Sequence, residues 1–173
     1  MLEQFLAPSC TPMNLAIFLV RSDILRALQD TTRYFSGTLL DVGCGHMPYK
    51  LLVLAPPSRA TRYVGLALES STYEAKPHLL WDGNRLPLPE NVVDCALATE
   101  VFEHCPSPEI VMGETLRVLK PGSLLFFAVP FLWPLHDVRT MSIAIRRSFW
   151  SVTYGTQCLR RSSSKRWAGG MRA

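Results

Sequence analysis

The sequence has few cysteines, and their positions suggest no shared role. Five occur among 173 residues, scattered from Cys10 to Cys158 without a Cys-x-x-Cys pair. Their odd number and wide spacing fit neither a disulfide framework nor a structural zinc site. The four histidines show no metal-ligand spacing with the cysteines, so the sequence predicts no metal site. We interpret this cysteine usage as typical of a reducing compartment and expect a cytoplasmic protein.

Long apolar runs are missing as well. The longest run near the start covers residues 15–20, far short of the roughly 20 residues of a membrane span. The residues before it carry Glu3 rather than a basic region, so neither a secretion signal nor a membrane span is predicted. Hydrophobic residues make up 48% of the chain and charged residues 18%, which is too apolar for intrinsic disorder. The length fits about one domain.

Acidic residues are absent after Asp137. Up to Val138 the chain has 10 basic and 14 acidic residues, whereas from Arg139 onward it has 8 basic residues and no acidic one. The net charge of +4 therefore hides a mildly acidic body and a basic tail. An acidic body does not favour nucleic acid as a partner. A nucleic-acid-binding module that uses the basic tail stays open as a minor alternative.

Apolar segments alternate with helical ones along the body. The predicted strands cover residues 38–42, 62–68, 78–81, 92–98 and 123–129, and the predicted helices cover 48–54 and 108–119. The strands lack polar alternation, which is typical of a parallel sheet covered on both faces. On the second helix, Ile110 is among the residues predicted to face inward. The pattern indicates an α/β fold with a mostly parallel sheet, preceded by N-terminal covering helices.

A glycine-containing turn follows the first predicted strand, in the sequence Leu-Leu-Asp-Val-Gly-Cys-Gly at residues 39–45. Small residues let the backbone approach a ligand closely, and the next helix presents its amides to the turn. Tight turns also use glycine for steric reasons, so this motif alone is weak evidence. A dinucleotide-binding turn has a third glycine three residues after the second, where this chain has Pro48. That position argues against NAD.

Seven segments occur in an order and spacing that resemble a known family. They are residues 39–45, 63–66, 81–83, 86–91, 93–94, 98–104 and 116–122. Together they resemble the class I S-adenosylmethionine-dependent methyltransferases of the methyltransferase domain 11 type, over about residues 37–137. The resemblance implies a Rossmann-like three-layer sandwich and S-adenosyl-L-methionine as cofactor. It also implies methyl transfer to an unidentified acceptor, which we expect to be a small or lipid-like molecule.

The resemblance assigns cofactor-binding roles to residues at three strand ends. These are Asp41, Gly43, Cys44 and Gly45 at the methionine part, Asp82 and Gly83 at the adenine, and Thr99 and Glu100 on the far side. The ribose position departs from the family pattern, because Ala67 stands where an acidic residue is expected. Glu69 lies two residues on, on the same side of an extended strand, and is the predicted substitute.

Two histidines are the candidate catalytic proton acceptors. His104 follows the fourth predicted strand, and His136 follows the fifth in an aromatic segment with Phe131 and Trp133. The alternative reading is architectural for Glu103 and His104, and packing for the aromatic segment. Because the cofactor brings its own activated methyl and leaving group, the family needs no obligatory triad.

The tail does not follow the family pattern, which continues with a helix and two further strands. Reading residues 139–145 one nucleotide earlier permits Pro-Tyr-Asp-Val-His-Arg-Tyr, which resembles the family. We therefore hypothesise a frameshift near Val138, with the C-terminal strands missing or irregular. The expected division is 1–36 as covering helices, 37–138 as the cofactor-binding core and 139–173 as a basic irregular tail. A non-catalytic cofactor-binding remnant is accordingly the main alternative to an active enzyme. The sequence predicts no oligomeric state.

Overall fold

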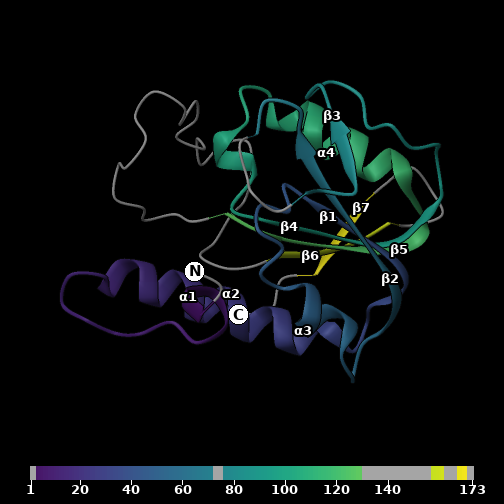
Figure 1. Ribbon diagram of the computed structural model, residues 1–173. Coiled ribbons are helices and arrows are strands. Elements are labelled where there is room, and N and C mark those ends of the chain that lie inside the picture. Colours follow the sequence, from purple (N-terminus) through teal and green to yellow (C-terminus); the bar gives the residue numbers. More distant parts are fainter. Residues whose placement is uncertain (1–2, 72–75, 130–156, 162–166, 171–173) are drawn as a thin grey trace.

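A seven-stranded sheet forms the centre of the protein in the computed structural model, which describes residues 3–71, 76–129, 157–161 and 167–170. The order across the sheet is β3-β2-β1-β4-β5-β6-β7 (Figure 1). The strands are β1 (Ser36–Val42), β2 (Arg59–Leu68), β3 (Leu79–Trp81), β4 (Val93–Thr99), β5 (Leu119–Ala128), β6 (Gln157–Arg161) and β7 (Trp167–Gly170). Among themselves the first five strands pair in parallel, as the sequence predicted.

Helices cover both faces of the sheet, which gives the predicted three layers. Helix α4 (Pro108–Val118) lies on one face, and α1 (Glu3–Leu6), α2 (Leu15–Thr32) and α3 (Lys50–Leu54) lie on the other (Figure 1). A short 3-10 helix, η1 (Phe102–His104), follows β4. Pro108 occupies the first turn of α4, where its missing N–H costs no hydrogen bond.

Buried side chains on the two faces of the sheet explain why its strands show no polar alternation. Leu39 and Leu40 are neighbours in β1, and neither is exposed. Leu40 packs with Val111 of α4, whereas Leu39 packs with Leu28 of α2 and Val53 of α3. Successive side chains of a strand point to opposite faces, so burial on both faces requires a continuous apolar run.

The structure corrects two details of the sequence prediction. Strand β5 begins at Leu119, directly after α4, rather than at Ser123. Its pairing with β4 shifts register between Val93 and Cys95, which accommodates the intervening residues as an irregularity at the strand's start. Ile110, predicted to face inward on α4, is 41% exposed.

Two C-terminal strands extend the sheet beyond β5. Strand β6 pairs antiparallel with β5, and β7 pairs antiparallel with β6. The sequence predicted missing or irregular strands here; the two that are present are short, and β6 runs against the direction of the first five strands, whereas β7 runs with it. The predicted boundary at Val138 lies outside the described residues, and the domain division stays a prediction.

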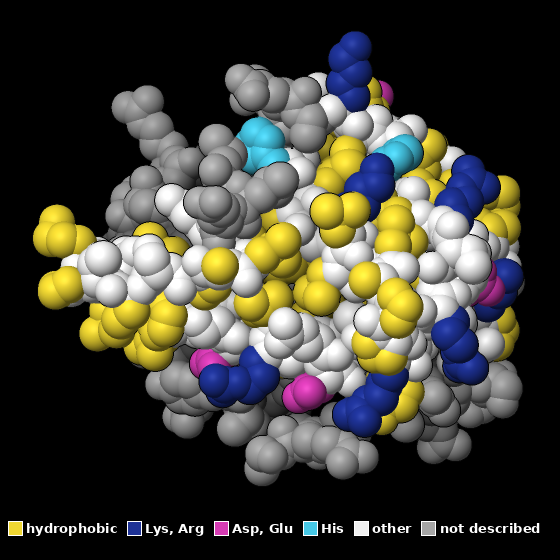
Figure 2. Space-filling model, turned by 60° about the horizontal axis from the view of Figure 1, so that its bottom comes forward, with side chains coloured by type: hydrophobic (Ala, Val, Ile, Leu, Met, Phe, Trp, Pro, Cys, Tyr) yellow, Lys and Arg dark blue, Asp and Glu magenta, His cyan; other side chains and the backbone are white. Residues whose placement is uncertain are grey.

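The hairpin of α1 and α2 projects from the body and carries exposed apolar side chains. Met13 is 96% exposed and Leu19 is 52% exposed. Figure 2 shows hydrophobic side chains gathered on the projecting end at its left. In the ranges that the structure describes, no helix combines the length and hydropathy that a membrane crossing requires.

Candidate functional site

The turn after β1 can be formed only by glycine at its first position. Gly43 has a φ of +69°, and a Cβ built there would lie 2.5 Å from Cγ2 of Val101. The next residue, Cys44, donates its backbone N–H to the carbonyl of Leu66 at 3.0 Å, which fixes the turn against β2. The left-handed φ and the close approach of the Val101 side chain together explain why this position requires glycine. The turn therefore opens at the carboxyl edge of the sheet.

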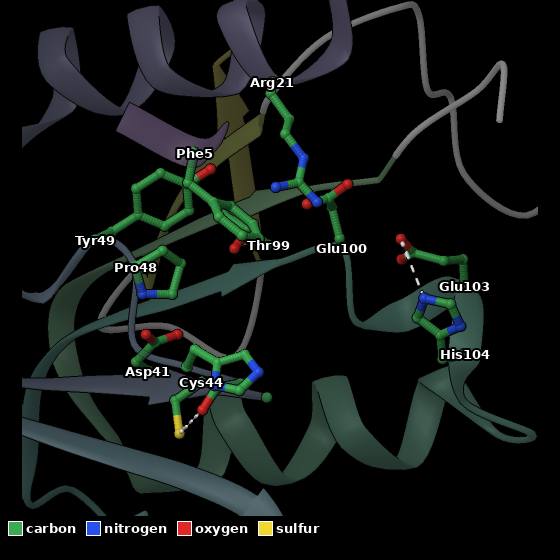
Figure 3. Close-up of a pocket in the computed structure, with 13 residues that line it drawn as sticks. Phe5, Arg21, Asp41, Cys44, Pro48, Tyr49, Thr99, Glu100, Glu103 and His104 are labelled. Carbon is green, nitrogen blue, oxygen red and sulfur yellow. Dashed lines mark hydrogen bonds and ion pairs between the residues drawn. The ribbon is translucent and has the colours of Figure 1, made fainter. Parts of the chain in front are cut away.

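Two cavities meet at this edge. The glycine-turn cavity, of about 200 Å³, lies beside residues 43–49 (Figure 3). The β2–β3 cavity, of about 670 Å³, lies over the ends of β2 and β3. Gly43, Glu100 and His104 line both, so the cavities are neighbours. They flank the point where the strand order reverses between β1 and β4, the usual ligand site of an open parallel sheet.

Unpartnered polar atoms are concentrated at the glycine-turn cavity. In the described part of the chain, the buried side-chain nitrogen and oxygen atoms that lack a hydrogen bond belong to Arg21, Tyr49 and Glu103. All three residues line this cavity. The Arg21 guanidinium also lies 3.5 Å from the ring centre of Phe5, which holds it at the cavity's edge (Figure 3). Buried polar groups normally have partners, so these atoms indicate a ligand-binding surface.

Two carboxyl groups of this cavity are buried. Asp41 is 3% exposed and accepts a hydrogen bond from the Tyr63 hydroxyl, and burial raises the pKa of its carboxyl to about 7. Glu103 is 4% exposed, and burial raises the pKa of its carboxyl to about 8. Oε1 of Glu103 lies 4.0 Å from Nε2 of His104. Perturbed carboxyls in a cleft are typical of functional sites.

Glu100 lies between the two cavities in a strained conformation. Its φ is +55°, which is uncommon for a residue with a side chain. Its backbone N–H donates to the carbonyl of Ala128 at 2.9 Å, and this hydrogen bond holds the end of β4 to β5. A strained residue at the ligand edge of a sheet is a further mark of a functional site.

Asp82 organises the loop that borders the β2–β3 cavity. Its Oδ1 accepts backbone hydrogen bonds from Asn84 at 2.8 Å and Arg85 at 3.1 Å, and these bonds lower the pKa of the carboxyl. Gly83 follows with a φ of +89°. Asp82 therefore forms a turn and also lines the cavity, so its turn role is compatible with the predicted role in cofactor binding.

A polar clamp on α4 fastens this loop. Glu114 accepts the backbone N–H of Leu86 at 2.9 Å. Arg117 donates to the carbonyl of Leu86 at 3.1 Å and to that of Leu88 at 2.9 Å. The two side chains also bond each other at 2.6 Å. The clamp thus positions the border of the β2–β3 cavity from the covering helix.

The structure brings most of the predicted site residues together. Asp41, Gly43, Cys44, Gly45, Thr99, Glu100 and His104 line the glycine-turn cavity, and Asp82 and Gly83 line the β2–β3 cavity. Burial raises the pKa of the Cys44 thiol to about 12, so Cys44 is a neutral wall residue. In the described ranges, no group of three His, Cys, Asp or Glu side chains could hold a metal ion.

One predicted site residue lies elsewhere, and another falls outside the described residues. Glu69 is exposed and lines neither cavity, whereas Ser70 and Ser71 line the β2–β3 cavity beside Ala67. The ribose-binding role of Glu69 stays a prediction. His136 lies outside the described residues, so its predicted catalytic role also stays a prediction.

Sequence reasoning missed Arg21 and Tyr49. Arg21 interrupts the apolar helical period of α2, and this interruption was the available signal. Tyr49 is 1% exposed and was hidden in an apolar run. Burial also raises the pKa of the Tyr49 hydroxyl, which keeps it a neutral donor.

The fold and site define a Rossmann-like domain with a ligand cleft at its topological switch point. The family model described as a methyltransferase domain matches residues 40–127, just over half of the chain. The chain therefore belongs to this family, the class I S-adenosylmethionine-dependent methyltransferases.

Relatives of several kinds carry the same segment. An uncharacterised methyltransferase of Mycobacterium sp. (strain KMS) is 32% identical over 110 residues, which cover 60% of this chain and 42% of that protein. The sterol 24-C-methyltransferase of Schizosaccharomyces pombe is 32% identical over 127 residues, covering 63% and 31%. The ubiquinone biosynthesis O-methyltransferase of Nitrosomonas europaea is 32% identical over 104 residues, covering 53% and 43%. The matched segment thus spans less than half the length of these relatives.

Solved structures share the fold at lower sequence identity. A putative methyltransferase from Bacillus halodurans superposes with a TM-score of 0.51 at 19% identity, covering 68% of this chain and 54% of that one. An S-adenosylmethionine-dependent methyltransferase from Mesorhizobium loti gives a TM-score of 0.50 at 21% identity, covering 61% and 52%. These similarities support the Rossmann-like sheet with its covering helices.

Proposed function

We propose that this protein binds S-adenosyl-L-methionine across the two cavities and transfers a methyl group to a small acceptor. The observation that carries the proposal is the set of buried, unpartnered atoms of Arg21, Tyr49 and Glu103 around the glycine turn. Guanidinium and hydroxyl donors fit a carboxylate, and a buried carboxyl fits a cation. The methionine part of the cofactor carries both charges, so these residues fit it. We further propose a cytoplasmic location from the cysteine usage.

The cavities suggest how the cofactor lies. Arg21 and Tyr49 would hold the methionyl carboxylate in the glycine-turn cavity, while the backbone at Gly43 approaches closely. The larger β2–β3 cavity takes the adenosine, with Asp82 at the adenine and apolar contacts from Ile110. Ile110 was predicted to face the core, but it is exposed and its side chain lines this cavity. It is therefore available for contact with the adenosine.

The cofactor supplies an activated methyl group and a thioether leaving group. The protein's own task is to align the acceptor, exclude water and remove the acceptor's proton. His104 is suited to that task because it lines both cavities and its side chain is 41% exposed. An imidazole with this access can take a proton from a hydroxyl or amine and return it to water. Glu103 lies behind His104, on the buried side.

The proposed acceptor is a small, lipid-like molecule. Two relatives are named for sterol and ubiquinone-biosynthesis methylation. The exposed apolar hairpin of α1 and α2 is also compatible with a lipophilic acceptor, because Phe5 of α1 lines the glycine-turn cavity.

A cofactor-binding protein without transferase activity is the second candidate. Ala67 favours it, because an alanine cannot accept the two ribose hydrogen bonds that a carboxylate would accept. Tight binding of S-adenosylhomocysteine without methyl transfer to any acceptor would support this candidate.

A thermal-shift experiment with S-adenosylhomocysteine tests the binding proposal. A ligand that binds only the folded state raises its stability by about 2.7 kcal/mol at a concentration of 100 times Kd. Arg21→Met should weaken the shift, because the carboxylate loses its guanidinium. Arg26→Met is the matched control on the same helix, since Arg26 is 77% exposed and lines neither cavity. An unchanged melting temperature with saturating ligand would refute the proposal.

A further inference from the structure

Glu103 is a buried carboxyl, and one of its two oxygens lacks a hydrogen-bond partner. Its side chain is 5% exposed, and its Oε2 has no hydrogen-bond partner. The side chain lines the glycine-turn cavity beside His104 (Figure 3). An ionised carboxylate in this setting would lose most of its hydration, with the 4.0 Å contact to His104 as its compensation. Burial therefore favours the neutral acid, and a cation that binds in the cavity favours the carboxylate.

The charged and titratable groups around Glu103 come from several elements. They are Arg21 of α2, Asp41 of β1, Cys44, His46 and Tyr49 at and after the glycine turn, Glu100 after β4, His104 of η1, and Cys105 directly after it. Carboxyl side chains thus outnumber guanidinium groups on the cavity wall. Glu100 repels a charge on Glu103, which together with burial raises the pKa of Glu103. The empty cavity favours the protonated acid, and a bound cation would reverse that preference.

We propose that Glu103 is the counter-ion of the cofactor's sulfonium and determines the preference of the site for the methylated cofactor over its demethylated product. This inference rests on the proposed function and adds a specificity-determining residue to it. S-Adenosylmethionine carries a positive sulfonium, whereas S-adenosylhomocysteine carries a neutral thioether. Both ligands carry the methionyl ammonium, so the sulfonium makes the first ligand favour the ionised form of Glu103 more strongly than the second. After methyl transfer the ligand is a neutral thioether, so its interaction with Glu103 is weaker and the product binds less tightly.

The proposal predicts a pH-dependent discrimination between the two ligands. The ratio of the Kd of S-adenosylhomocysteine to that of S-adenosylmethionine should rise between pH 6 and pH 8. With a free pKa of about 8, a fall of one pKa unit on binding gives a rise of about fivefold, and a fall of two units about 25-fold. Asp41 affects both ligands alike, because both carry the same methionyl ammonium. Sinefungin, in which a protonated amine replaces the methylsulfonium, should follow S-adenosylmethionine.

The experiment measures the three dissociation constants by calorimetry across this pH range. In Glu103→Gln the ratio should be flat, because the amide cannot ionise. Glu109→Gln is the matched control, since Glu109 is an exposed residue of α4 that lines neither cavity, and it should keep the dependence of the wild type. A ratio that is flat in the wild type, or a rise that persists in Glu103→Gln, overturns the proposal.

A second measurement uses the wild-type protein alone and covers the case in which Glu103→Gln does not fold. Calorimetry at pH 7 in two buffers of different ionisation enthalpy counts the protons released on binding. S-Adenosylmethionine should release a larger fraction of a proton than S-adenosylhomocysteine. Equal release overturns the role of Glu103 while leaving the proposed function intact. Absence of binding by every ligand instead overturns the proposed function, and this inference with it.

Discussion

Three glycines form a matched series that tests why the turn after β1 requires glycine. Gly43 combines a φ of +69° with a Cβ position 2.5 Å from Cγ2 of Val101. Gly122 has a φ of +82° but open space around its Cβ position. Gly113 lies inside α4, with open space and no positive φ. Substitution by alanine therefore adds strain and a clash at the first, strain alone at the second, and neither at the third.

The expected changes in the free energy of unfolding differ in size and sign. Gly122→Ala should cost about 1–2 kcal/mol, the usual penalty of a left-handed backbone with a side chain. Gly43→Ala should cost about 1–3 kcal/mol more, because the branched Val101 side chain is stiff and cannot move aside easily. Gly113→Ala should stabilise the protein by about 0.5–1 kcal/mol, since alanine is the better helix former.

Urea unfolding followed by far-ultraviolet circular dichroism measures all three changes. Gly43→Ala should also weaken the binding of S-adenosylhomocysteine, because its methyl group displaces the side chain of Val101, which lines the β2–β3 cavity. If Gly43→Ala destabilises the protein no more than Gly122→Ala does, the clash with Val101 is refuted. If Gly43→Ala binds the ligand as tightly as the wild type does, the place of Gly43 in the ligand cleft is refuted.

Two further predictions concern the α4 clamp and Asp41, and a third concerns the coding DNA. Arg117→Lys keeps the charge but loses the guanidinium fork to the carbonyls of Leu86 and Leu88, so stability should fall by about 1–2 kcal/mol. Amide hydrogen exchange in residues 82–88 should quicken, and unchanged exchange would contradict the clamp. Burial raises the pKa of Asp41 from 3.8 to about 7, so its contribution to stability is full below pH 3.8 and is lost as the pH rises towards 7. The loss is up to about 1.4 kcal/mol for each pH unit, and Asp41→Asn should remove this part of the pH dependence in urea unfolding. Finally, the coding DNA read one nucleotide earlier after codon 138 should give a family-like continuation, and its absence would rule out the frameshift.

Short-range patterns in the sequence were enough to predict the sheet and the glycine turn. Continuous apolar runs, such as the one that contains Leu39 and Leu40, are needed wherever a strand is buried on both faces. The turn at Gly43 was likewise visible, because a left-handed φ leaves its mark on residue type. Errors occurred at boundaries, as at Leu119, where β5 begins directly after α4 and register with a distant strand decides the start.

Only the tertiary structure decided which polar groups are buried together. Arg21, Tyr49 and Glu103 come from distant segments, and their exposure and unpartnered atoms depend on how α2, the turn and η1 pack. Ile110 has the spacing of a core residue, yet it lines a cavity because α4 leaves room beside β3. Residue type determines which chemistry a side chain can perform. The burial and the interaction partners of that side chain depend on how segments distant in the chain pack together. Burial and partners in turn determine whether the side chain performs that chemistry.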